Sequence, residues 1–111
     1  MKTKFTAFLL LATLFGTAAI AHAENIVPVV DSTPPVIVLM GEASVSVTQG
    51  EEYADDGATA QDDTDGDITS NIIVDNAVDV SIVGTYIVSY SATDLAGNRA
   101  EITRTVEVVA P

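Results

Sequence analysis

Side chains branched at Cβ dominate this chain from residue 24 onward, and they constrain its fold more than any other feature. Valine, isoleucine and threonine make up more than a third of residues 24–111, whereas leucine occurs there only as Leu39 and Leu95. Branched residues lose rotamer freedom in a helix and fit well on a pleated surface. No stretch repeats apolar residues at helical spacing over a convincing length. The sequence therefore predicts an all-β fold.

Short apolar runs separated by turn residues predict about seven strands. They are expected at 36–39, 44–47, 57–60, 72–74, 85–93 and 99–109, with one or two more within 78–83. Prolines between residues 24 and 34 predict an extended leader, because proline fixes φ and donates no backbone hydrogen bond. Strands of this number and length favour a two-sheet β-sandwich over residues 35–109.

Residues 1–23 have the pattern of a cleaved signal peptide. Lys2 and Lys4 precede a mostly apolar run of about 16 residues, and Ala21-His22-Ala23 provides the small residues that signal peptidase reads. The alternative is a retained membrane anchor, but a spanning helix needs about 20 apolar residues. We therefore expect cleavage between Ala23 and Glu24, export to the periplasm or beyond, and no membrane span in the mature chain.

Charge and composition exclude several functions. The net charge is −12, and both lysines leave with the signal peptide, so the mature chain is more acidic still. Such a surface repels phosphate backbones and anionic lipids, so we expect no nucleic-acid partner. The chain has no cysteine and therefore no disulfide. Without cysteine, histidine or lysine after residue 23, the usual nucleophile–base pairs are missing, and we expect no enzymatic activity.

Four segments carry a resemblance to a known family: 31–39 (DSTPPVIVL), 57–69 (GATAQDDTDGDIT), 83–86 (VGTY) and 90–98 (YSATDLAGN). In this order and spacing they resemble the bacterial immunoglobulin-like domain of the insecticidal-crystal-protein type, formerly a domain of unknown function. They are also similar to the hyalin-repeat (HYR) domain. The resemblance implies an immunoglobulin-like β-sandwich. Such domains serve in spacing, adhesion and contact with carbohydrate or protein, and the fold alone fixes none of these roles.

Two features of the strand from residue 85 onward have a structural interpretation. Tyr86 follows Gly84 by two residues, where the resemblance implies a tyrosine corner whose hydroxyl bonds to the backbone a few residues upstream. The loop 94–98 after this strand contains Gly97, which is available for a positive φ angle.

Arg104 falls on the inward face of the final strand, between Ile102 and Val106. Either a bulge turns it outward, or its stem packs inside while its guanidinium reaches a carboxylate near the sheet edge. We favour the second interpretation, which is a structural role.

An acidic loop is the candidate site. Asp62, Asp63, Asp65 and Asp67 lie within six residues, and the expected topology brings Asp94 to the same end of the sandwich. Carboxylates gathered without a cation repel one another, and oxygen-only ligands suit Ca²⁺, with Asn98 Oδ1 as a further donor. The alternative is that these residues are ordinary turn formers that cap backbone amides. Asp55-Asp56 should lie at the opposite end as a turn element.

These features together predict an exported, non-catalytic immunoglobulin-like module for binding or adhesion that contacts a surface protein or a glycan. The segment 44–48 and the final strand are the edges expected to accept a partner strand. Two alternatives remain open: a Ca²⁺-dependent structural or spacer module, and a single-copy remnant of a tandem-repeat surface protein.

Overall fold

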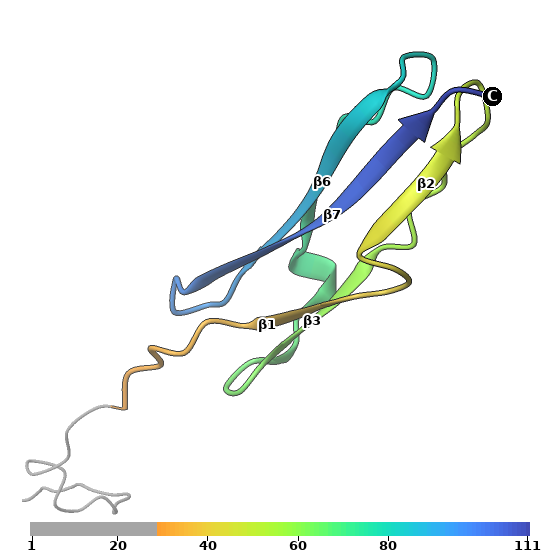
Figure 1. The fold of residues 1–111 in the computed structure, drawn as a ribbon. Coiled ribbons are helices and arrows are strands. Elements are labelled where there is room, and N and C mark those ends of the chain that lie inside the picture. The colour runs from red at the N-terminus through yellow and green to blue at the C-terminus, as the bar shows by residue number, and fades with distance from the viewer. Residues whose placement is uncertain (1–28) are drawn as a thin grey trace, which may run out of the picture.

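The computed structural model describes residues 29–111, which fold into two facing β-sheets (Figure 1). The predicted signal peptide and the first residues of the predicted leader lie outside this range. The elements are β1 (Val36–Leu39), β2 (Ser44–Thr48), β3 (Ala58–Asp62), β4 (Gly66–Asp67), a 3₁₀ turn (Thr69–Asn71), β5 (Ile73–Asn76), β6 (Gly84–Thr93) and β7 (Arg99–Val109). Among the described residues, no helix is long and apolar enough to cross a membrane. The predicted all-β, two-sheet sandwich of seven strands is confirmed.

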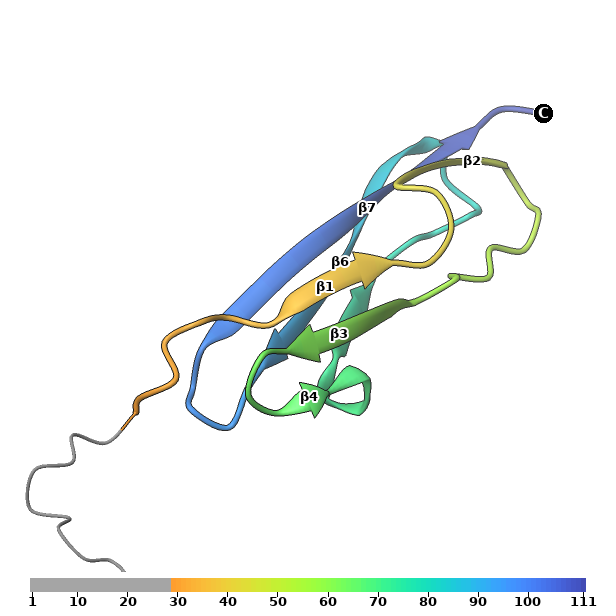
Figure 2. The same cartoon turned by 90° about the horizontal axis from the view of Figure 1, so that it is seen from below.

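One sheet has three strands in the order β1-β3-β4, and the other has four in the order β2-β7-β6-β5. All neighbours are antiparallel except β2 and β7, which run parallel from Ser44↔Thr105 to Thr48↔Val109. The chain therefore leaves the first sheet after β1 and crosses by a loop to join the second as β2 (Figure 2). The longest ladder, β6 with β7, forms the centre of the larger sheet.

Strict alternation along β6 and β7 makes the core. Val88, Tyr90 and Ala92 of β6 are buried, and so are Val106 and Val108 of β7, which lie opposite Tyr86 and Gly84. Side chains two residues apart share one face of a strand, so one face of each ribbon packs inward while its polar neighbours face water. Ile37, Ala60 and Ile68 cover this layer from the smaller sheet and the segment that follows it.

Two details differ from the expected strands. Residues 77–83 form no strand, because the side chains of Asn76 and Asp79 accept the amides of Val78 and Ser81 at 3.1 and 3.0 Å and turn the chain. The final strand is also not an edge, because β7 pairs on both sides, with β2 and β6. The edges of the larger sheet are β2 and β5.

The expected tyrosine hydrogen bond is present. Tyr86 Oη donates to the carbonyl of Ile82 at 2.7 Å, and the ring is half-buried. The bond therefore lies at the rim of the sandwich, not inside it. Gly97 has the expected positive φ, 95°. Gly84 does not, and a Cβ at that position would make only ordinary contact with the Tyr86 ring, at 3.9 Å.

Removing the Tyr86 hydroxyl should destabilise the fold modestly. In Tyr86→Phe the ring is kept and the bond to Ile82 is lost, so we expect the free energy of unfolding to fall by about 0.5–1 kcal/mol. Urea denaturation of the variant and the parent protein measures this difference. An unchanged midpoint would show that water satisfies the hydroxyl equally well and that the corner stabilises nothing.

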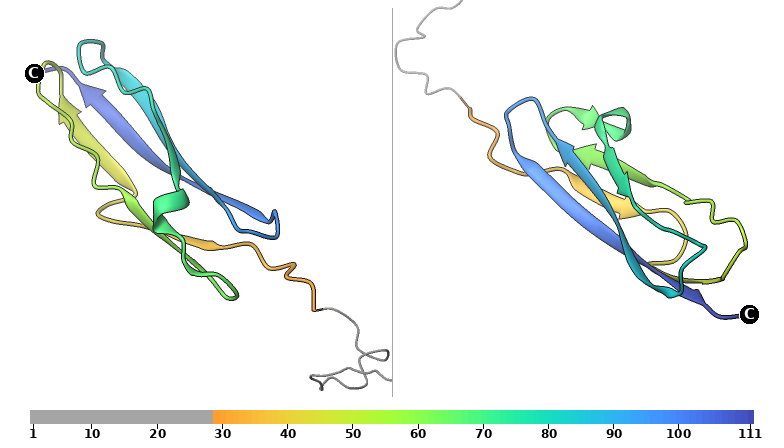
Figure 3. Two further views of the ribbon diagram at one scale, coloured as in Figure 1. Left: turned by 180° about the vertical axis from the view of Figure 1, so that it is seen from behind. Right: turned by 90° about the horizontal axis from the view of Figure 1, so that it is seen from above.

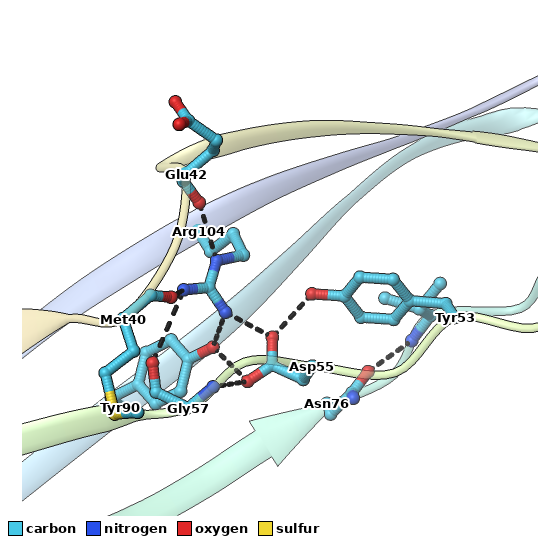
Figure 4. Close-up of polar contacts among 9 residues, drawn as sticks. Met40, Glu42, Tyr53, Asp55, Gly57, Asn76, Tyr90 and Arg104 are labelled. Atoms are coloured by element: carbon cyan, nitrogen blue, oxygen red, sulfur yellow. Dashed lines mark hydrogen bonds and ion pairs between the residues drawn. The ribbon is translucent and has the colours of Figure 1, made fainter.

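Arg104 is the largest fully buried side chain of the described residues, with 1% of its surface exposed. Its Nη1 donates to Asp55 Oδ1 at 2.6 Å and to Tyr90 Oη at 2.7 Å (Figure 4). Its Nε donates to the carbonyl of Glu42 at 2.8 Å, and its Nη2 donates to the carbonyl of Met40. The predicted inward stem and carboxylate partner are therefore present, with the guanidinium held between the two sheets.

The partner carboxylate is Asp55, which precedes β3 and was expected to form only a turn. It does accept the Gly57 amide at 2.9 Å, but it also accepts the Tyr53 hydroxyl at 2.5 Å and the Tyr90 hydroxyl. Burial alone would raise the pKa of Asp55, yet these donors and Arg104 outweigh it and lower the pKa to about 2. One carboxylate thus fixes Arg104 and two tyrosine hydroxyls.

Replacing Asp55 should be far more harmful than replacing its neighbour. Asp55→Ala leaves Arg104 buried without a counter-charge, and we expect a loss of about 3 kcal/mol of stability. Asp56→Ala, at an exposed carboxylate, is the matched control and should change stability by less than about 0.5 kcal/mol. Equal losses in the two variants would contradict the role given to Asp55.

The pair of Asp55 and Arg104 also predicts how the stability of the fold depends on pH. The pKa of Asp55 in the folded state, about 2, lies below its ordinary value of 3.8. Its stabilising contribution, about 2 kcal/mol, is therefore present above pH 4 and lost as the pH falls through 2. Between pH 4 and pH 2 the melting temperature of the parent protein should fall more steeply than that of Asp55→Ala. An equal fall in the two proteins would contradict this.

Candidate functional site

Three separate segments meet at one pole of the sandwich. They are the leader before β1, the turn between β3 and β4, and the loop between β6 and β7; the C-terminus lies at the other pole (Figure 3). The first two meet because β1 and β3 are antiparallel with Val36 opposite Gln61, so residues before β1 lie beside those after β3. The predicted meeting of the acidic loop with the loop containing Asp94 is present, since the Leu95 amide donates to Asp65 Oδ2 at 2.8 Å.

Asp62 is the central residue of this pole. It ends β3 and is 6% exposed. Its Oδ2 accepts the amides of Thr64 and Asp65 at 3.0 and 2.9 Å, which is the capping that an ordinary turn former would provide. Its Oδ1 is buried and, within the part of the chain that the structure describes, has no hydrogen-bond partner.

Asp94, at the end of β6, is 5% exposed. Its Oδ1 accepts the backbone amide of Asn98 at 2.8 Å, and its Oδ2 accepts the Asn98 side-chain amide at 3.0 Å. The nitrogen of that amide, not Oδ1, therefore faces Asp94, unlike the Asn98 ligand atom proposed from the sequence. Burial alone would raise the pKa of Asp94, but the Asn98 donors outweigh it and lower the pKa.

Asp31, in the leader, completes the group and was missed in the sequence. Its carbonyl accepts the Asn98 side-chain amide at 2.9 Å, which ties the leader to the β6–β7 loop. Its Oδ1 accepts the Thr33 amide, whereas its Oδ2 is buried and has no partner among residues 29–111. The Thr33 amide lowers the pKa of Asp31, but burial and the neighbouring Asp62 and Asp94 carboxylates outweigh it and raise the pKa.

The carboxylates proposed as metal ligands from the sequence do not all lie together. Carboxylate oxygens of Asp31, Asp62 and Asp63 lie within 4.8 Å of one another, and so do those of Asp62, Asp65 and Asp94. Asp67 belongs to neither group. Its Oδ1 accepts the Thr69 amide at 2.9 Å, and the side chain and amide of Thr69 lower its pKa, which is the expected behaviour of a turn residue. The structure therefore gathers four of the five candidates and adds Asp31.

Chemically, this pole offers carboxylate oxygens and backbone carbonyls from three loops. Such a donor set fits a hard cation such as Ca²⁺ and supplies neither sulfur nor imidazole for softer metals. It lies where the leader meets the body of the sandwich, with Asp62 and Asp94 buried and Asp63 exposed.

The architecture is that of a small immunoglobulin-like sandwich that lacks the disulfide of antibody domains. More specifically, residues 37–108 match the family described as the Ig-like domain of bacterial surface proteins, and the chain belongs to this family. The immunoglobulin-like resemblance seen in the sequence is thereby confirmed, whereas the finer resemblance to the crystal-protein type and to HYR domains stays a prediction. No curated protein matched the sequence.

Solved bacterial structures have a similar fold. A lipoprotein from Bacteroides thetaiotaomicron matches 68% of this chain with 26% identity and a TM-score of 0.61. Two structures of ZmpB from Clostridium perfringens also match. One contains the M60 catalytic domain with the CBM51-1 and CBM51-2 domains, and covers 72% of this chain at 29% identity and a TM-score of 0.57. The other contains CBM51-2 in complex with GlcNAc and INT domains, and covers 69% at 32% identity and a TM-score of 0.54.

This chain spans only part of each of these proteins: 38% of the lipoprotein, and 8% and 17% of the two ZmpB structures. The fold therefore occurs in them as one segment of a larger protein. The chain is an immunoglobulin-like module of the bacterial surface.

Proposed function

We propose that this chain is an exported, non-catalytic module that serves as a rigid spacer on the bacterial surface. In this proposal the signal peptide is cleaved before Glu24, and the sandwich holds the leader at one pole and the C-terminal end at the other in a fixed relative orientation. The observation that carries the proposal is the placement of the two ends of the described chain. The leader joins the sandwich at the acidic pole, and the last strand ends at the opposite pole (Figure 1).

Each end is fixed to the body where it meets it. At the acidic pole, Pro35 is buried and Asn98 holds the carbonyl of Asp31 at 2.9 Å. At the other pole, the Gln49 amide donates to the carbonyl of Val109 at 2.7 Å, directly beyond the pairing of β2 with β7. A module held in this way transmits orientation from one pole to the other. A flexible linker would not.

The lack of catalysis is proposed from composition and from the position of the polar groups. Residues 24–111 contain no cysteine, histidine or lysine. Arg104, Asp55 and two tyrosines form a polar network that is buried between the sheets, where it stabilises the fold. In the ZmpB structure that includes the M60 catalytic domain, this chain matches 8% of the length, which fits an accessory role.

Distance measurements between the poles test the spacer role. The chain has no cysteine, so spin labels can be attached at Ser32→Cys and Ala110→Cys, one at each pole. We expect a single distance distribution as narrow as that of a reference pair, Thr85→Cys with Thr93→Cys, at the two ends of β6. The intact mass of the exported protein should correspond to residues 24–111. A broad distribution between the poles would contradict the proposal.

Direct contact with a surface protein is a second candidate, favoured by the edge strand β5. All four residues of β5 are exposed, including Ile73 at 71% and Val74 at 48%. β5 is the last strand of its sheet, so its outer backbone groups are available to an extended segment of a partner. A glycan is less well supported, because the Tyr53 and Tyr90 hydroxyls are directed into the Arg104 network and their rings are not free to stack on a sugar.

Blocking this edge tests the second candidate. Val74→Pro removes a backbone donor and a packing surface at β5, whereas Ser46→Pro makes the matched change on β2, the opposite edge of the sheet. With circular dichroism showing both variants folded, we expect capture of envelope proteins by the immobilised module to fall at least tenfold in Val74→Pro alone. Undiminished capture would rule out this edge as the contact.

A further inference from the structure

The acidic pole buries carboxylates without a basic side chain beside them. Asp62 and Asp94 are 6% and 5% exposed, and Asp31, Asp63 and Asp65 lie around them. Residues 29–111 contain only two basic side chains. Arg104 is paired with Asp55 in the core, and Arg99 lies 3.5 Å from Glu101 on the surface. The basic residues of the described chain are thus engaged elsewhere.

Two carboxylate oxygens at this pole have no hydrogen-bond partner among the described residues: Asp62 Oδ1 and Asp31 Oδ2. Both are buried atoms, and a buried polar atom without a partner costs free energy unless an ion or a water satisfies it. Turn capping does not account for them, because in each residue the capping is done by the other oxygen. These two unpaired oxygens therefore distinguish this pole from an ordinary acidic turn and favour a ligand site.

The two residues also lie close enough to share one ion. Oxygens of Asp31, Asp62 and Asp63 lie within 4.8 Å of one another. Two oxygens bound to one Ca²⁺ at about 2.3–2.6 Å can be separated by at most about 5 Å. Asp65 and Asp94 bring further oxygens to the same Asp62 carboxylate. Mg²⁺ fits less well, because it keeps several waters and seldom binds in an all-protein cage.

We infer that this pole binds one Ca²⁺ ion, held by Asp62 at its centre, Asp31 from the leader, and Asp63, Asp65 or Asp94 from the two loops. The ion joins three chain segments that the hydrogen bonds of Asn98 to Asp31 and of Leu95 to Asp65 already bring together. Its consequence is to fix the direction in which the leader departs from the body. The inference goes beyond the spacer role, since a metal site can exist whether or not the module is used as a spacer.

Calorimetric titration of chelator-treated residues 24–111 with CaCl₂ tests the site directly. We expect one ion per chain with a dissociation constant on the order of 10⁻⁴ M, as in other extracellular calcium modules, and a melting temperature that rises with Ca²⁺. A flat titration with no change in melting temperature would overturn the inference, and so would equal affinity for Mg²⁺. The label distances, measured without added Ca²⁺, test the spacer role independently of either result.

Three variants locate the ion. Asp62→Asn and Asp31→Asn should each weaken binding at least tenfold, whereas Asp67→Asn, in the same turn but outside both carboxylate groups, should leave it within about twofold. Asp31→Asn keeps an oxygen for the Thr33 amide, so it tests the site even where Asp62→Asn fails to fold. If Asp67→Asn weakens binding as much as Asp31→Asn does, the ion is only attracted to a negative surface, and the proposed site is wrong.

Discussion

A buried arginine holds this sandwich together where antibody domains use a disulfide. Arg104 lies on the inward face of the central ladder and carries a charge that water cannot reach. It is stable there because Asp55 supplies the counter-charge, and the carbonyls of Met40, Glu42 and Gly57 accept hydrogen bonds from its remaining N–H groups. These partners belong to the β1–β2 turn and the segment before β3. One side chain therefore joins the final strand to two of the three connections that cross between the sheets, β1–β2 and β2–β3.

The acidic pole presents the same problem without the same solution. Asp62 and Asp94 are as well buried as the core, but their neighbours are other carboxylates. The two arginines of residues 29–111 are paired elsewhere, Arg104 with Asp55 and Arg99 with Glu101. Their donors are backbone amides and Asn98, which leaves one oxygen of Asp62 and one of Asp31 unsatisfied among residues 29–111. The carboxylates near the two ends of β3 therefore differ. Arg104 compensates the charge of Asp55 before the strand, whereas the charge of Asp62 at its end suits a cation from solution.

Much of the fold could be predicted because it depends on local patterns. Alternation in 85–93 and 99–109 placed the core residues correctly, and the inward position of Arg104 followed from the same period of two. The extra strands expected within 78–83 were wrong, because the valines there suggested a ladder while Asn76 and Asp79 used their side chains to bend the backbone.

The sites could be predicted only in part, because their residues are distant in sequence. Asp55 was taken for a turn residue since nothing nearby in the sequence marks it as the partner of an arginine 49 positions later. Asp31 was assigned to a leader, although antiparallel pairing of the first strand with the third implies that it lies near Asp62. Asp67 was grouped with the cluster by spacing alone, and its hydrogen bond to Thr69 separates it.

In this acidic chain two groups of buried carboxylates are each matched to a cation: Asp55 to Arg104, and the group around Asp62 to the proposed calcium ion. A crystal structure of residues 24–111 grown with calcium tests it most directly. We expect a single strong electron-density peak about 2.3–2.6 Å from Asp62 Oδ1 and from oxygens of its neighbours, together with an intact Arg104–Asp55 pair. Only water beside Asp62, or its carboxylate turned out toward solvent, would contradict the account.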